Sequence, residues 1–102
     1  MSDVLKKLQV IPGIGKSLSR DLVDLGFRDV DELRSQNPRE MYLKLCSLRG
    51  QYQDRCVLYV FRCAVYFAGN KTHDPDLLKW WNWKDANLSN ISEKDLSLIH
   101  AK

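Results

Sequence analysis

The chain contains few residues of the kinds that build metal, disulfide or catalytic sites. Its three cysteines, Cys46, Cys56 and Cys63, form no Cys-x-x-Cys or Cys/His pair at zinc-site spacing. An odd number without close pairs is also a poor disulfide framework, so we expect buried, reduced thiols. No Ser-His-Asp set, nucleophile turn or pair of carboxylates in an evident pocket can be recognised. We therefore expect a protein that is not an enzyme and that has no metal or organic cofactor.

Long hydrophobic runs and a strong charge of one sign are missing too. The longest apolar run, within residues 56–68, is interrupted by Arg62 and is too short to span a bilayer. The N-terminus lacks the apolar segment of a signal peptide, so we expect a cytoplasmic protein without a membrane partner. The net charge is +3, and residues 1–34 carry six basic and six acidic side chains. This balance is unlike a basic nucleic-acid-binding tail, so charge alone does not identify a partner.

Strand-like alternation is also absent, whereas a helical period recurs along the chain. It predicts helices over about residues 4–11, 18–25, 29–33, 38–48 and 54–68. Gly26 and Gly50 are typical helix-ending residues, and Asn37 before Pro38 is a typical helix start. Asp29 with Glu32 resembles a capping box. We expect an all-α fold, a single small bundle of about five helices whose fifth helix is the most buried.

An aromatic extension follows the fifth helix. Trp80, Trp81 and Trp83 either pack on the bundle as a strap, the favoured interpretation, or stack on exposed bases. We place the α-helical domain at residues 1–84 and a C-terminal tail at 85–102, with one or two helical turns within residues 90–100. Ser92 would cap these turns.

Two isolated polar residues have structural explanations. Arg62, alone in an apolar helix, should pair with a carboxylate or reach solvent at the edge of the bundle. His73 stands in the sequence His-Asp-Pro-Asp, which contains a turn signal, and should lie in a solvated loop.

Glycine is scarce, with five residues in the chain, yet two stand one residue apart in the stretch Ile-Pro-Gly-Ile-Gly at 11–15. Three interpretations are open: a nucleotide-phosphate loop, a tight turn between helices, or a hairpin that offers its amides to a nucleic-acid backbone. A P-loop requires glycine where this chain has Val10, and the dinucleotide motif requires one at Leu18. Both nucleotide interpretations are therefore disfavoured.

The hairpin interpretation accounts for more residues than a plain turn does. If Ile11 and Ile14 pack inward, the backbone between them turns outward with little side chain over it. The amides of Gly13, Ile14 and Gly15 then lie at the N-terminus of the next helix, where unpaired donors and the helix dipole favour an anion. The basic side chains that flank this position are Lys6, Lys7, Lys16 and Arg20.

The stretch "LQVIPGIGKSLSRDLVDLGF" resembles the helix-hairpin-helix motif, in which apolar, x, Gly, apolar, Gly precedes a helix. Hairpin amides of that family hold the DNA backbone without reading its sequence, and some members bind a monovalent cation there. The resemblance implies hairpin contacts from Gly13, Ile14 and Gly15, and a phosphate contact from Lys16. Ser19 replaces the usual alanine of the motif and is small enough to keep the helices packed.

The segments "DRCVLYVFRCAVYFA" and "LKWWNWKD" look like a small bacterial family labelled "pathogenicity locus" (the Cdd family), some of whose relatives carry a mitomycin-resistance label. This resemblance covers about residues 4–85. The fold that it implies is also similar to the SAM-like, all-α C-terminal domain of the competence regulator TfoX. The resemblance implies DNA-related biology and no established reaction.

Two functions remain open. The first is sequence-independent DNA binding through residues 13–16 with Arg20 and Lys7. One such motif should bind weakly, with a dissociation constant of ~10⁻⁴–10⁻⁶ M. A homodimer or a partner would therefore be needed for useful affinity. The alternative is a protein-interaction module with a SAM-like fold.

Overall fold

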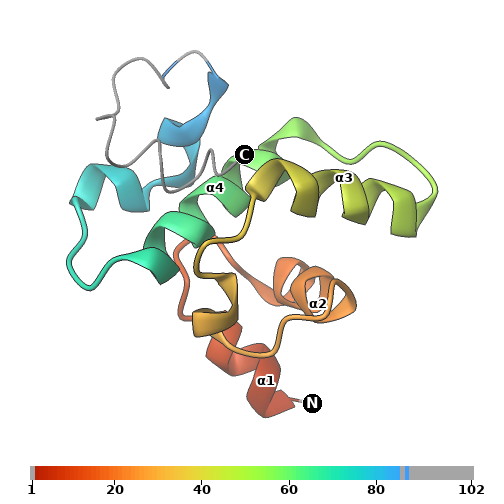
Figure 1. The fold of residues 1–102 in the computed structure, drawn as a ribbon, viewed down its shortest axis with the longest axis horizontal. Coiled ribbons are helices and arrows are strands. Elements are labelled where there is room, and N and C mark those ends of the chain that lie inside the picture. Colours follow the sequence, from red (N-terminus) through yellow and green to blue (C-terminus); the bar gives the residue numbers. More distant parts are fainter. Residues whose placement is uncertain (1, 86, 88–102) are drawn as a thin grey trace.

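The computed structural model describes residues 2–85 and residue 87 (Figure 1). These residues form the α-helices α1 (Ser2–Leu8), α2 (Lys16–Asp24), α3 (Pro38–Arg49) and α4 (Arg55–Gly69). Three short 3₁₀ turns, η1 (Val30–Leu33), η2 (Pro75–Leu78) and η3 (Trp80–Trp83), complete the described part, in which there is no strand. The all-α class is confirmed. The one or two helical turns expected within residues 90–100 lie outside the described residues.

The third of the five expected helices is a single 3₁₀ turn, η1. Asp29 caps it as expected, since its carboxylate accepts a hydrogen bond from the Asp31 amide. The Glu32 carboxylate, however, accepts from the Arg28 amide at 2.6 Å, one residue before the position of a capping box. Ser35 then has a φ of +65°, which is incompatible with continuing the helix. The expected helix therefore stops after one turn.

The start and end of α3 are those that the sequence predicts. The Asn37 side chain accepts hydrogen bonds from the amides of Arg39 and Glu40, and Pro38 occupies the first turn. Gly50 ends the helix in the left-handed conformation, with a φ of +72°. These local signals confirm the position of α3 in the chain.

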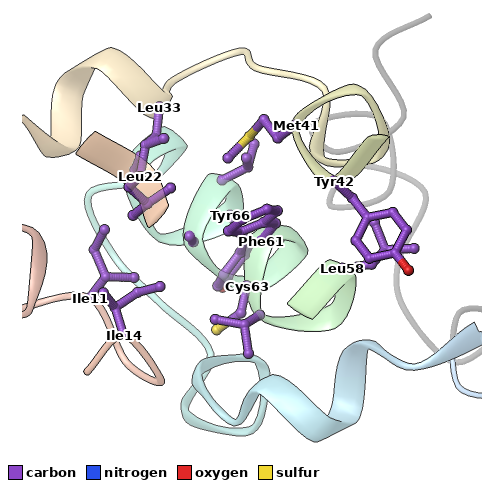
Figure 2. Close-up of a cluster of buried hydrophobic side chains, with 14 of the residues drawn as sticks. Ile11, Ile14, Leu22, Leu33, Met41, Tyr42, Leu58, Phe61, Cys63 and Tyr66 are labelled. Carbon is purple, nitrogen blue, oxygen red and sulfur yellow. The ribbon is translucent and has the colours of Figure 1, made fainter. Parts of the chain in front are cut away.

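Helix α4 lies at the centre of the molecule, as predicted (Figure 1). It contacts α3 and all three 3₁₀ turns, while α1 and α2 pack against each other. Figure 2 shows its side chains Phe61, Cys63 and Tyr66 among buried residues of the other elements. The connection between α1 and α2, residues 9–15, is called the hairpin below and contributes Ile11 and Ile14 to this cluster. Leu22 comes from α2, Leu33 from η1, and Met41 and Tyr42 from α3. One hydrophobic core thus joins the described elements.

Arg62 is buried in this core, with 7% of its surface exposed, and is fully paired. Its Nη1 donates to the Trp83 carbonyl at 2.8 Å and lies 2.9 Å from Asp85 Oδ1. Asp85 also pairs with Arg55 at the start of α4. The predicted carboxylate partner is confirmed, and it comes from the first residue of the expected tail.

The three tryptophans differ in their surroundings. Trp83 is fully buried against Tyr66, and its indole N–H donates to the Leu77 carbonyl at 2.8 Å. Trp80 is half-buried, and Trp81 is 52% exposed beside it. The interpretation that the tryptophans pack on the bundle therefore holds for Trp83 and Trp80, whereas about half of the Trp81 surface is exposed to solvent.

His73 is half-buried rather than solvated. Its ring stacks on Phe67 with the ring centroids 4.7 Å apart, and its Nε2 lies 2.9 Å from the Phe67 carbonyl oxygen. The chain turns back over the end of α4 at this point, which the turn signal did not reveal. Asp74, in contrast, is exposed and caps η2 with its carboxylate.

The cysteines are unpaired, Cys46 and Cys63 being buried as expected and Cys56 half-buried. Within residues 2–85, no helix is both long and apolar enough to cross a membrane.

Candidate nucleic-acid interface

The Ile-Pro-Gly-Ile-Gly stretch forms the connection between α1 and α2. The side chains of Ile11 and Ile14 are buried in the core, while Gly13 and Gly15 are exposed. The backbone between the two isoleucines therefore faces outward, as the sequence predicts. Pro12 is half-buried and contributes no amide hydrogen to this surface.

Gly13 is required by the fold itself. Its φ is +87°, a region that residues with a side chain rarely adopt. A Cβ at this position would also lie 2.9 Å from Cδ1 of Trp80, because the indole packs directly on the hairpin. Both the turn and the aromatic strap thus explain this glycine without any ligand.

Gly15 has no such explanation. It is the N-cap of α2 in an extended conformation, with φ −99° and ψ −160°, which any residue can adopt. An added Cβ would have no neighbouring atom within 4 Å. Serine, aspartate or asparagine would cap the helix here with a side-chain oxygen. Neither packing nor backbone geometry therefore requires a bare backbone at residue 15.

The amides of the hairpin are not all available. The Ile14 N–H donates to the Ile11 carbonyl at 3.1 Å, so this predicted contact is engaged within the turn. The amides of Gly13 and Gly15 donate to no described residue. The first N–H groups of α2, next to Gly15, have no preceding carbonyl within the helix, and the positive end of its dipole lies there. This end of α2 can accept an anion.

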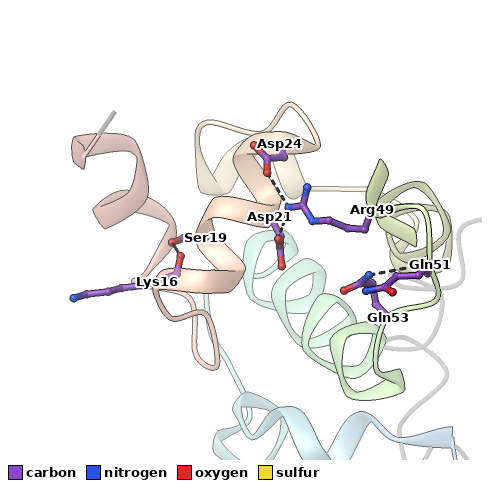
Figure 3. Close-up of polar contacts among 7 residues, drawn as sticks. All are labelled: Lys16, Ser19, Asp21, Asp24, Arg49, Gln51 and Gln53. Atoms are coloured by element: carbon purple, nitrogen blue, oxygen red, sulfur yellow. Dashed lines mark hydrogen bonds and ion pairs between the residues drawn. The ribbon is translucent and has the colours of Figure 1, made fainter. Parts of the chain in front are cut away.

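Basic side chains lie on both sides of the hairpin. Lys16 and Arg20 are exposed one turn apart on α2, and Lys16 points away from the body of the domain (Figure 3). Lys6 and Lys7 are exposed in the last turn of α1, where the helix dipole also favours cations. None of the four forms an ion pair with a described residue. Their positive charge is therefore free to attract an anion.

The acidic residues of α2 are held on another face of the helix. Arg49 of α3 reaches across to Asp21 and Asp24, with Nη2–oxygen distances of 2.6 and 2.8 Å (Figure 3). The hydrogen bonds that Arg49 donates to these carboxylates raise the pKa of its guanidinium above the usual value. The pairing offsets part of the negative charge of α2 and separates it from Lys16.

Ser19 does more than fit between the helices. It is fully buried, its hydroxyl donates to the Lys16 carbonyl at 2.9 Å, and it accepts from Gln9 Nε2 at 3.1 Å. The bond from Gln9 links the residue that follows α1 to the buried face of α2.

Sequence reasoning missed two residues that shape the hairpin, Trp80 and Gln9. Trp80 is separated from Gly13 by most of the chain, and no local pattern indicates their contact. Gln9 is close in sequence, and its position opposite the unusual Ser19 was a signal that could have been found.

The geometry defines a small all-α domain in which an exposed connection with two glycines joins the short helices α1 and α2. The chain belongs to the family described as "Pathogenicity locus", whose model matches residues 1–88. It is also similar to the mitomycin resistance protein McrB of Streptomyces lavendulae, with 28% identity over 76 residues, or 74% of this chain and 69% of that protein. No solved structure is significantly similar to the chain.

Proposed function

We propose that the protein binds nucleic acid, DNA in the first place, without reading its sequence, through the hairpin between α1 and α2. Gly15 is the observation that carries this proposal. A bare backbone where any side chain would fit is expected if a ligand must approach the peptide groups closely. A phosphate oxygen suits this position, because the available donors are amide N–H groups at a helix N-terminus.

The basic residues would supply the remaining attraction. Lys16 and Arg20 would contact neighbouring phosphates, and Lys7 would add charge from α1. Backbone contacts carry no base information, so binding would be sequence-independent. With two or three phosphates neutralised, the dissociation constant should be in the non-specific range of ~10⁻⁴–10⁻⁶ M. Useful affinity would then come from a homodimer or from a partner that carries a second binding motif.

On this proposal, the hairpin and its two helices are a helix-hairpin-helix, in which a monovalent cation could accompany the phosphate. The domain would then be SAM-like and related to the C-terminal domain of TfoX. Buried isoleucines on both sides of an outward-facing backbone support this assignment. The names of the family and of the McrB relative refer to pathogenicity and to mitomycin resistance, and they do not identify a bound molecule.

Fluorescence anisotropy with a labelled DNA duplex at about 50 and 200 mM salt tests the proposal. The wild-type protein should lose about 10- to 40-fold in affinity across this range, which corresponds to two or three released counterions. Lys16→Glu should weaken binding and make the salt dependence less steep by about one ion.

Gly15→Asp separates binding from folding. The new carboxylate should cap α2 and raise the unfolding temperature by about one or two degrees, while repelling phosphate. Gly15→Ser is the matched control, because it adds a capping oxygen without a charge. DNA affinity in Gly15→Asp equal to that of Gly15→Ser, or no duplex binding at the lower salt concentration, would contradict the proposal.

A further inference from the structure

A groove lies between α2 and α4, next to the hairpin. It has a volume of about 470 Å³ and extends from Gly13 to the residues that precede α4. Its lining includes Leu18 of α2, Val57 and Val60 of α4, and Trp80 of η3. Leu18, Val57 and Trp80 are each half-buried, so they present apolar surface to the groove. The volume is in the range that proteins use to hold ligands or partner side chains.

The shape of this groove is fixed by packing. The Trp80 indole rests on Gly13, and both residues line the groove. Val57 and Val60 belong to the central helix, which is held on several sides by other elements. A groove on such rigid walls does not need to open in order to receive a ligand.

The rim of the groove is acidic, although the chain as a whole carries a charge of +3. Asp54 is exposed, and its carboxylate forms neither an ion pair nor a capping hydrogen bond with a described residue. Asp21 also lines the groove, and it shares Arg49 with Asp24, so this cluster keeps a net charge of −1. The neighbouring Arg55 is already paired with Asp85. The rim therefore attracts cations and repels phosphate.

We propose that this groove binds a basic amphipathic peptide segment of a partner protein. An aliphatic side chain of the segment occupies the apolar wall formed by Leu18, Val57 and Trp80. A lysine or arginine one turn away on the same segment lies beside Asp54. Charge complementarity selects this partner, since the two carboxylates of the rim disfavour an acidic peptide or a nucleic acid. The basic side chains of Lys7, Lys16 and Arg20 do not line the groove.

The test uses the full chain labelled with ¹⁵N and two helical peptides of about 12 residues, one of leucine and lysine, the other with glutamate in place of lysine. The lysine peptide should shift the amide signals of Ser17, Asp54 and Val57 and the indole signal of Trp80. The glutamate peptide should leave these signals unchanged. Shifts of the same signals on concentrating the protein alone would assign the groove to a second copy of the chain and overturn the proposal.

Three variants make the test quantitative. Asp54→Asn should weaken the lysine peptide about two- to fivefold, as expected for an exposed charge pair, and Asp54→Lys should weaken it about tenfold. Both should fold normally, because the Asp54 side chain does not cap α4. Asp31→Asn, an exposed aspartate on η1, removes the same charge and should bind like the wild type.

Equal binding of the two peptides, unchanged affinity in Asp54→Lys, or no binding of the lysine peptide at millimolar concentration would overturn the proposal. DNA affinity, measured on the same Asp54 variants, should not fall. The groove and the hairpin proposals can therefore fail independently.

Discussion

At the scale of single residues, the two glycines of the hairpin have different roles. Gly13→Ala should destabilise the protein by about 1–3 kcal/mol, because alanine is strained at a φ of +87° and its Cβ collides with Trp80. Gly15→Ala should change the free energy of unfolding by less than about 0.5 kcal/mol, since its site is open. Urea denaturation followed by tryptophan fluorescence measures both changes. Equal losses in the two variants would contradict the packing of Trp80 on the hairpin.

At the scale of elements, two ion pairs join the segment after η3 to α4. The carboxylate of Asp85 pairs with Arg62, which is buried, and with Arg55, which is exposed. Burial raises the pKa of the Asp85 carboxyl, but the hydrogen bonds from Arg55 and Arg62 outweigh burial, and the pKa is lower than usual. A lowered pKa in the folded state means that this interaction stabilises the protein above the unfolded-state pKa of about 3.9. The stabilisation is lost as the pH falls through the lower pKa of the folded state.

Asp85→Asn should therefore be less stable than the wild type at pH 7, by about 1 kcal/mol given that the carboxylate is half exposed. The difference should shrink as the pH falls below about 4, because the wild-type carboxyl is then protonated. Urea denaturation at several pH values measures it, with Asp31→Asn as a control for general charge effects. A stability difference that stays constant down to pH 2 would show that the Asp85 ion pairs do not stabilise the strap.

The elements differ in how well the sequence predicts them. α3 is set by signals within a few residues, namely the Asn37 cap, Pro38 and Gly50, and these were recognised. The turn η1 was predicted as a helix because its cap is correct, whereas the positive φ of Ser35 that ends it has no sequence signal. The two glycines indicate the exposed connection between α1 and α2, and its role in binding stays a prediction. The engagement of the Ile14 amide and the contact with Trp80 depend on three-dimensional packing, which local patterns do not encode.

At the scale of the whole molecule, the reactivity of the three cysteine thiols measures how well the folded domain excludes solvent from its core. Burial raises the pKa of the Cys63 thiol to about 12, so it should be unreactive at pH 8 in the folded protein. Cys46 is also buried, and Cys56 is half-buried. A thiol-specific reagent should modify Cys56 first, and the other two only as fast as the domain unfolds.

Mass spectrometry of the modified peptides identifies the order, and Cys56→Ser should remove the fast phase. Full denaturation should make all three thiols equally accessible. Rapid modification of Cys63 without denaturant would mean that α4 is not the centre of a closed core.

The contact between the Trp80 indole and Gly13 joins two segments that are synthesised at different times. A ribosome releases the hairpin long before it adds residues 75–83, so the nascent N-terminal half is without the ring that covers this glycine. The contact between the Trp80 ring and Gly13 therefore forms only after the tryptophan segment has left the exit tunnel. The packing of the N-terminal connection is thus completed by a segment from the C-terminal half of the described chain.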